Sequence, residues 1–221
     1  MSFRKIHLRK LLRAFGSTEK ELNRLIREDI RTEVRKENNF GGSGGDFHTP
    51  FWADAKDFVI VGSGLEERTQ SRIESSPQKK RLYPELCKGF IDWWESEKRF
   101  TNEKIELLTE PISEKMEFEG LQAAVKFENF MGLKFGDAET RLIYPYFSEE
   151  PELSTQNARL GLWALSAAFP QYPISNFHIL DILRSASFSV DDCPLTGGEE
   201  NTFKDAYAKV LKRWDELREE Y

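Results

Sequence analysis

Residues Leu121 to Phe169 read LQAAVKFENFMGLKFGDAETRLIYPYFSEEPELSTQNARLGLWALSAAF, and this stretch decides the predicted fold. Apolar residues alternate with other residues over 121–128 and again over 130–147, which predicts β-strands. Gly136 and Asp137 interrupt the second run. Both residue types tolerate the backbone angles of a tight reversal, so they predict the turn of a hairpin.

A helix is predicted to follow these strands. After Pro151 the apolar residues recur at intervals of three and four, which predicts a helix over 154–169. Ser154 or Thr155 is placed to cap its first turn, because a hydroxyl oxygen there accepts a hydrogen bond from a free backbone N–H. The apolar face of this helix must pack back on the sheet.

The flanking segments add further helices and strands. Helical spacing of apolar residues predicts helices over 82–99 and 203–221, and apolar runs predict strands over 105–109, 176–184 and 186–190. The expected fold class is therefore α/β (α+β), with a small central mixed sheet flanked by helices and an N-terminal helical extension.

Composition limits the classes of function. The 221 residues include 17 Phe and 5 Trp, enough to build a large core. The net charge of −6 argues against a protein whose whole surface binds a polyanion, but it leaves a local basic face open. Cys87, Cys193 and three scattered histidines lack metal-binding spacing. No run approaches the roughly 20 apolar residues of a membrane span, so we expect a cytoplasmic protein.

Residues 1–37 are predicted to form a basic helical arm, with eleven Lys or Arg against six Asp or Glu. Thr18 and Glu21 have capping-box spacing, which predicts the start of its second helix. A Gly-rich linker is predicted over 38–50 and an α/β core domain over 51–221. The arm could bind nucleic acid, dock a protein partner or a second copy of the chain, or contact the protein's own acidic body. The candidate binding residues are Arg4, Lys5, Arg9, Lys10 and Arg13.

Two further polar features lie outside the arm. His48 lies among aromatic residues, where a histidine is typically a structural hydrogen-bond donor but can also act chemically. The run Ser75 to Arg81 is predicted to be an exposed basic turn.

The order of elements over about residues 82–200 resembles the PD-(D/E)XK nuclease fold. The shared pattern is a helix, a three-stranded meander, a packed helix and a returning strand, and the resemblance is to the RecB-like branch. There LGLWALSAAFP stands in the place of the helix after the catalytic strand. Active members have an acid at the end of the second strand and Asp or Glu, a spacer and Lys on the third, with a divalent cation between them. The resemblance implies a prokaryotic nucleic-acid-processing or phage-defence setting.

The sequence departs from this pattern at the expected metal site. Tyr144 and Tyr146 stand where the acid and the lysine belong, and a tyrosine with an ordinary pKa of about 10 supplies no anionic ligand at neutral pH. The favoured hypothesis is a non-catalytic binding or assembly protein without a cofactor. The alternative is a nuclease dependent on Mg²⁺ or Mn²⁺, with acidic ligands that have moved to new positions. Those candidates are Glu128, Asp137, Glu149 and Glu150.

Overall fold

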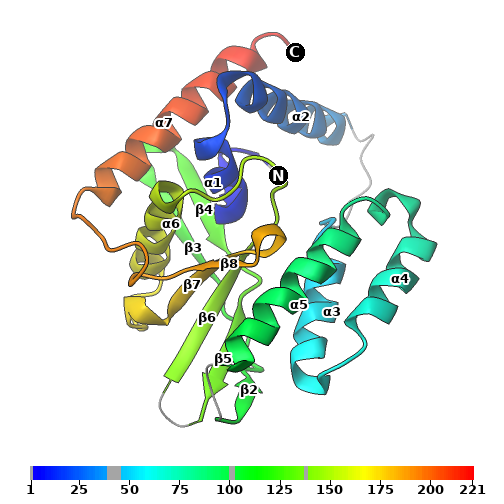
Figure 1. Ribbon diagram of the computed structural model, residues 1–221. Coiled ribbons are helices and arrows are strands. Elements are labelled where there is room, and N and C mark those ends of the chain that lie inside the picture. The colour runs from blue at the N-terminus through cyan, green and yellow to red at the C-terminus, as the bar shows by residue number, and fades with distance from the viewer. Residues whose placement is uncertain (1, 39–45, 100–102, 137–138) are drawn as a thin grey trace.

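The computed structural model describes residues 2–38, 46–99, 103–136 and 139–221. These residues form an α+β fold in which helices surround two mixed sheets, so the predicted fold class is confirmed (Figure 1). The helices are α1 (Leu8–Gly16), α2 (Glu19–Glu37), α3 (Thr49–Val61), α4 (Leu65–Ser75), α5 (Tyr83–Arg99), α6 (Thr155–Ala168) and α7 (Glu199–Arg218). Within the described ranges, none of them combines the length and the apolar character needed to cross a bilayer.

The larger sheet contains the predicted hairpin. Its strand order is β2 (Ile105–Leu107), β5 (Met131–Phe135), β6 (Glu139–Tyr146), β7 (Phe177–Asp181) and β8 (Ala186–Phe188). β5 and β6 pair antiparallel with Phe135 opposite Glu139, which confirms the reversal between them. Asp137, predicted in the turn, lies outside the described residues. β6 and β7 run parallel, so their carboxyl ends lie at the same edge of the sheet.

A smaller sheet corrects the predicted meander. Its strand order is β1 (Lys5–His7), β4 (Ala123–Phe127) and β3 (Glu114–Phe118). The strand predicted over 121–128 is β4, and it pairs with β1 and β3 instead of joining the sheet of β6. Alternating apolar residues identify a strand but not its partner, which explains the error. The sequence does not predict β1 or β3, since β1 has only three residues and β3, EKMEF, has only two apolar ones, Met116 and Phe118.

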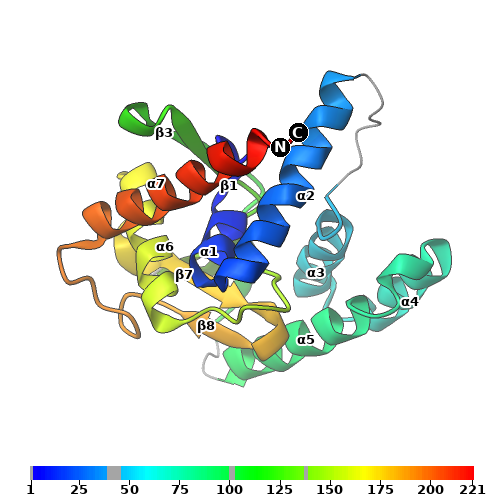
Figure 2. The same ribbon diagram turned by 90° about the horizontal axis from the view of Figure 1, so that it is seen from above.

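The side chains of β6 alternate between two cores. Leu142, Tyr144 and Tyr146 are buried in a core shared with α1, α6 and α7. Ile143 and, just beyond the strand, Phe147 belong to the core under α3, α4 and α5. Figures 1 and 2 show these two groups of helices on opposite sides of the larger sheet. The period of two predicted for this strand is therefore confirmed.

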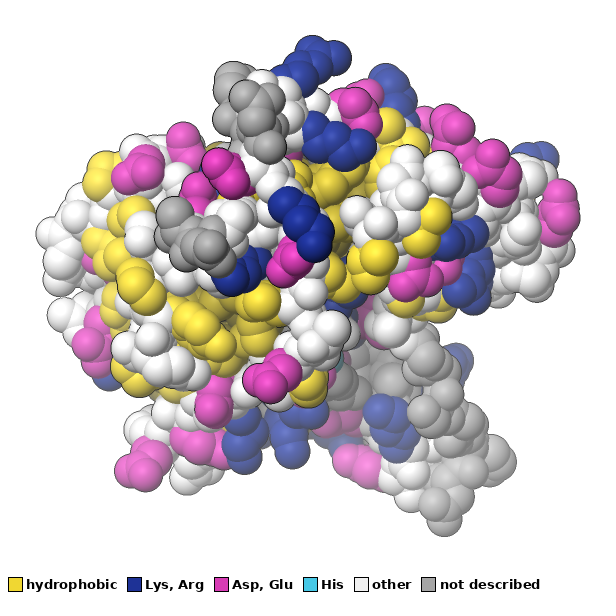
Figure 3. All heavy atoms as spheres, turned by 90° about the horizontal axis from the view of Figure 1, so that it is seen from below, with side chains coloured by type: hydrophobic (Ala, Val, Ile, Leu, Met, Phe, Trp, Pro, Cys, Tyr) yellow, Lys and Arg dark blue, Asp and Glu magenta, His cyan; other side chains and the backbone are white. Residues whose placement is uncertain are grey.

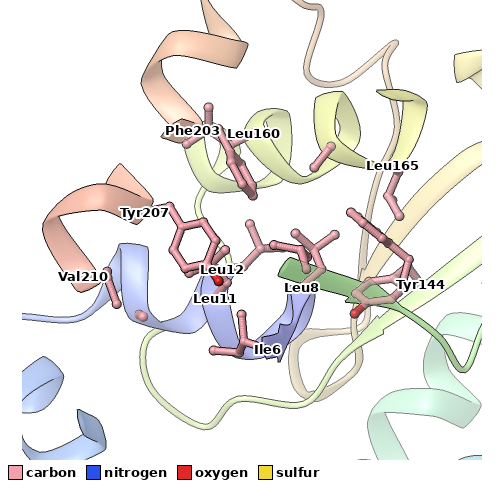
Figure 4. Close-up of a cluster of buried hydrophobic side chains, with 14 of the residues drawn as sticks. Ile6, Leu8, Leu11, Leu12, Tyr144, Leu160, Leu165, Phe203, Tyr207 and Val210 are labelled. Atoms are coloured by element: carbon pink, nitrogen blue, oxygen red, sulfur yellow. The ribbon is translucent and has the colours of Figure 1, made fainter. Parts of the chain in front are cut away.

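Residues 2–37 are a layer of the fold and not a free arm. β1 pairs parallel with β4, and α2 packs along α7 (Figure 2). Leu8, Leu11 and Leu12 of α1 are at most 1% exposed and lie among side chains of α6, α7 and β6 (Figure 4). Burial of this apolar stripe holds the basic segment against the core. The linker predicted over 38–50 stays a prediction, because the structure describes only Asn38 and residues 46–50 of it.

Caps and amphipathic faces occur where the sequence predicts them. Thr18 and Glu21 form the reciprocal capping box of α2. Ser154 caps α6, with 3.2 Å between its Oγ and the backbone N–H of Asn157 that donates to it. The apolar face of α7 is buried from Phe203 to Leu217. The strand predicted over 176–184 is shorter, since β7 ends at Asp181 in a 3₁₀ turn.

Candidate functional site

A cavity of about 330 Å³ lies at the carboxyl end of β6. Four segments meet there: the basic side of α1, the residues that lead into α3, the residues before α5 and the residues after β6. Four basic side chains and two carboxylates line it, together with His48 and apolar groups. We call it the basic pocket, and its charged residues are Arg9, Lys10, Arg13, Arg81, Asp46 and Glu149.

α1 supplies three of the cations. Arg9 and Arg13 are one helical turn apart and Lys10 lies beside them, so α1 presents all three to the pocket. Arg13 donates from Nε to the carbonyl oxygen of Glu150 at 3.1 Å. Lys10 is exposed and has no ion pair among the residues that the structure describes. Neither Lys10 nor Arg13 forms an ion pair among the described residues, although Arg13 is near enough to Glu149 for their charges to interact.

Arg9 and Asp46 form the most enclosed ion pair of the pocket. Arg9 Nη2 lies 2.6 Å from Asp46 Oδ2, and the Arg9 side chain is only 7% exposed. Asp46 Oδ1 accepts a hydrogen bond from the backbone N–H of His48 at 2.9 Å. Hydrogen bonding to His48, together with the charge of Arg9, keeps the pKa of Asp46 far below its ordinary value despite partial burial. Asp46 is consequently ionised throughout the neutral range.

Aromatic rings form the other wall. His48 stacks on Phe147 with ring centroids 4.6 Å apart and 12° between the planes. Phe47 meets His48 edge to face at 5.1 Å, and the guanidinium of Arg9 lies 5.9 Å from the centre of the Phe147 ring. Leu82 completes this side. The pocket thus combines aromatic and apolar side chains with cationic ones, and the two kinds meet where Arg9 lies over Phe147.

Arg81 and Glu149 close the outer rim. The guanidinium of Arg81 makes two hydrogen bonds to the Glu149 carboxylate, one of them 2.7 Å from Nη2 to Oε1. This pairing with Arg81 lowers the pKa of Glu149. Both side chains are substantially exposed, so the pair can open at little cost when a ligand competes for Arg81.

A buried carboxylate at the end of β7 holds the loop that carries Glu149. Asp181 is 1% exposed, and its Oδ2 accepts a hydrogen bond from the backbone N–H of Leu153 at 3.0 Å. Arg184 donates to the carbonyl oxygens of Ser148, at 2.6 Å, and Glu149. Burial raises the pKa of Asp181. The edge where β6 and β7 end is therefore fixed by hydrogen bonds from β7.

The two tyrosines at the expected nuclease positions are structural. Tyr144 is fully buried, and burial raises its pKa above the ordinary value of a phenol. Tyr146 donates to the carbonyl oxygen of Pro151 at 2.7 Å, and burial raises its pKa to about 12. Both phenols are neutral at pH 7, so neither offers an anionic metal ligand.

The three alternative acidic ligands that the structure describes, Glu128, Glu149 and Glu150, do not form a metal site. Glu128 lies beside the smaller sheet, with Oε2 3.8 Å from His7 Nδ1 and Oε1 3.6 Å from Lys126 Nζ. Glu149 is held by Arg81, and Glu150 contributes its carbonyl oxygen to Arg13. Asp137 lies outside the described residues. Within the described ranges, no three His, Cys, Asp or Glu side chains gather as a metal site.

The five predicted binding residues divide into two groups. Arg9, Lys10 and Arg13 line the basic pocket. Arg4 pairs with Asp215 at 2.6 Å and lies over the ring of Trp214, so it ties β1 to α7. Lys5 points to a different depression that it shares with α2. β1 is extended and α1 is helical, which is why adjacent basic residues diverge.

Sequence reasoning missed the residues that complete the pocket. Arg81 lies in an exposed turn, as the sequence predicts, but nothing in the sequence indicates that Arg81, Asp46 or Phe147 belongs to a site. They lie far from α1 in the sequence, and no local motif predicts that they meet it.

On the face seen from below, acidic, basic and hydrophobic side chains are interspersed (Figure 3).

Comparison with known proteins does not assign a family. No protein-family model matches the sequence, and no curated protein matches it. The resemblance to the PD-(D/E)XK fold therefore stays a prediction. What the site can do follows from its geometry and charge.

Proposed function

We propose that the chain is a non-catalytic protein that binds nucleic acid through the basic pocket. The observation that carries the proposal is the convergence of Arg9, Lys10, Arg13 and Arg81 at one cavity in a chain whose net charge is −6. Arg and Lys contacts to phosphate supply most of the affinity of proteins for nucleic acid. A local concentration of positive charge on an acidic protein is the electrostatic feature such binding requires.

The packing of the N-terminal helices favours nucleic acid over the protein partner that was also predicted. Leu8 and Leu11 of α1 are buried inside the fold, and Ile26 and Ile30 of α2 are buried in the same core. The apolar faces with which a docking helix binds a protein groove are thus already occupied. The basic sides of α1 and α2 remain to meet a ligand, and the basic residues of α1 are the ones that line the pocket.

The positions of the acids support binding without catalysis. Glu149 would have to leave Arg81 to bind a cation, and Glu128 lies between Lys126 and His7. A carboxylate that is paired with a basic side chain is a poor ligand for a hard divalent ion, because the two cations compete for the same oxygens. We therefore favour a binding function over the nuclease alternative.

The proposal is tested by mobility shift with single- and double-stranded DNA and RNA, in parallel with and without Mg²⁺ or Mn²⁺. We expect a salt-sensitive complex and intact nucleic acid. Lys10→Gln and Arg13→Gln should weaken the complex, because each removes a cation from the pocket. Arg27→Gln is the matched control, since Arg27 is an exposed residue of α2 paired with Glu220 and does not line the pocket.

Two outcomes would overturn the proposal. One is the absence of a complex with all four nucleic acids at low salt. The other is metal-dependent cutting that Glu128→Ala abolishes, which would establish the nuclease alternative. Equal weakening by Lys10→Gln and Arg27→Gln would show that binding occurs away from the pocket.

A further inference from the structure

Arg9 has an unsatisfied hydrogen-bond donor at the pocket. One guanidinium nitrogen, Nη2, is held by Asp46, whereas Nη1 is buried and has no hydrogen-bond partner among the described residues. The side chain is more than nine-tenths buried and lines the cavity. A buried donor that lacks a partner is unfavourable, and a charged donor most of all. Nη1 has almost no surface open to solvent, so an oxyanion in the pocket would satisfy it with a charge-assisted hydrogen bond once the Arg9 side chain turns toward the cavity.

The charge of the pocket matches a doubly charged ligand. Four Lys and Arg side chains line the pocket with two carboxylates, which leaves an excess of two positive charges among these six residues. A phosphodiester within a strand carries one negative charge. A terminal phosphomonoester carries about −1.5 to −2 at pH 7 and has three strong acceptor oxygens. The excess therefore fits a terminal phosphate better than an internal one.

The size and the second wall of the pocket indicate what the phosphate is attached to. A volume of about 330 Å³ is at the lower end of the range for small-molecule sites, which is roughly 300–1,000 Å³. This space suits one nucleotide and not a stretch of strand. The lining also includes Phe47, His48 and Leu82, apolar and aromatic side chains against which a base can pack.

We infer that the basic pocket binds a single nucleotide that carries a terminal phosphate, with the phosphate at Arg9, Lys10 and Arg13 and the base against Phe47 and His48. The nucleotide is either the phosphorylated end of a strand or a free mononucleotide, which share this chemistry. The inference rests on the proposed function and narrows it from nucleic acid in general to its phosphorylated end.

The test compares single-stranded oligonucleotides of one sequence with a 5′-phosphate, a 3′-phosphate or two hydroxyl ends, each labelled on an internal base. Fluorescence anisotropy should show about tenfold or tighter binding of one phosphorylated form over the hydroxyl form. A mononucleotide should displace it, and inorganic phosphate should displace it less well. Arg9→Gln and Lys10→Gln should remove the preference, and Phe47→Leu should reduce the advantage of mononucleotide over phosphate. Arg27→Gln should retain all three properties.

Arg9 is buried, so Arg9→Gln can also disturb the fold. Lys10→Gln changes an exposed residue and is the variant that separates loss of binding from loss of folding. Equal binding of all three oligonucleotides would overturn the inference and leave the proposed function standing. Binding of a mononucleotide without any oligonucleotide would keep the pocket assignment and overturn the proposed function. Displacement by inorganic phosphate as effective as that by mononucleotide would overturn the part of the inference that concerns the base.

Discussion

The phenol oxygen of Tyr144 accepts a hydrogen bond from the backbone N–H of Arg9, 3.1 Å away. Arg9 is in the first turn of α1, where backbone donors have no partner within the helix. Tyr144 therefore fixes the start of the helix whose basic side chains line the pocket. Its structural role and the proposed binding function depend on the same contact.

Tyr144→Phe is expected to destabilise the protein by about 1–3 kcal/mol, because it leaves the buried N–H of Arg9 without an acceptor. Urea unfolding followed by circular dichroism measures the change. Tyr172→Phe is the control, since the Tyr172 ring contacts Phe177 but its hydroxyl has no hydrogen bond among the described residues. Equal stability of the two variants would show that the contact between Tyr144 and Arg9 contributes nothing.

The contact between α5 and the turn after β7 requires a glycine. A Cβ atom on Gly89 would lie 2.0 Å from the backbone carbonyl oxygen of Ile182, and Ser185 donates to the Gly89 carbonyl at 2.9 Å. Gly89→Ala should therefore push α5 from the sheet and lower the unfolding free energy by at least about 2 kcal/mol. Gly120→Ala, where a Cβ meets nothing within 4 Å, should change it by less than about 0.5 kcal/mol. A stable Gly89→Ala protein would contradict this packing.

Local patterns predicted the elements whose signal lies within one short segment. The hairpin of β5 and β6 follows from a period of two broken by Gly136, and α6 follows from a period near 3.6 after a serine cap. These features depend on neighbours in the sequence. The same holds for the capping box of Thr18 and Glu21, whose partners are three residues apart.

Features that depend on distant partners were not predictable in this way. The amino-acid sequence of residues 123–127 does not show that they pair with Lys5–His7, more than a hundred residues earlier. The basic pocket is a similar case, because Arg81 and Asp46 meet α1 only through the tertiary fold. A basic face on the N-terminal segment can therefore be predicted from the sequence, whereas the cavity beside it cannot.

Stability should fall between neutral and mildly acidic pH because of two histidines. Burial lowers the pKa of His7 and of His178 to about 4, from an ordinary value of 6.5. The unfolded chain binds these protons first, so stability present above pH 6.5 is lost as the pH falls toward 4. The slope is about 1.4 kcal/mol per pH unit for each histidine that has become protonated only in the unfolded chain.

Urea unfolding at pH 7.5, 6.5, 5.5 and 5.0 measures this dependence. His7→Gln and His178→Gln should each flatten it, since each removes one titrating group. Asp29 and Asp181 act in the opposite direction: burial raises their pKa values, so the folded protein gains stability as the pH falls from those raised values toward their ordinary 3.8. A wild-type unfolding free energy that is the same at pH 7.5 and 5.0 would contradict the prediction.

The start of α7 depends on a carboxylate that reaches back to the preceding turn. Glu199 accepts hydrogen bonds from the backbone N–H of Thr196 at 2.7 Å, from its hydroxyl at 2.8 Å, and from the N–H of Gly197 at 2.9 Å. Although burial raises the pKa of Glu199, these hydrogen bonds lower it to about 2. The stabilisation is present above its ordinary pKa and is lost as the pH falls toward 2.

Glu199→Gln is expected to cost about 1–2 kcal/mol at pH 7, because it removes a charged acceptor. Glu200→Gln is the control, since Glu200 is exposed and pairs with Lys204 one turn away, a contact worth less than about 0.5 kcal/mol. Urea unfolding at pH 7 and pH 3 measures the free energy of unfolding of both variants and distinguishes their effects. Comparable losses for both variants at pH 7 would contradict a specific role for Glu199.

The number of cations that meet phosphate can be counted from the salt dependence of binding. If Lys10 and Arg13 neutralise phosphates, each releases counterions on binding, and the logarithm of the affinity falls linearly with the logarithm of salt concentration. Lys10→Gln and Arg13→Gln should each reduce the magnitude of that slope by about 0.7 for a single strand. Arg27→Gln should leave the slope unchanged, because its ion pair with Glu220 lies on α2 outside the pocket. Anisotropy titrations from 50 to 300 mM KCl measure the slopes, and an unchanged slope in Lys10→Gln with a reduced one in Arg27→Gln would place the phosphates on α2 instead of at the pocket.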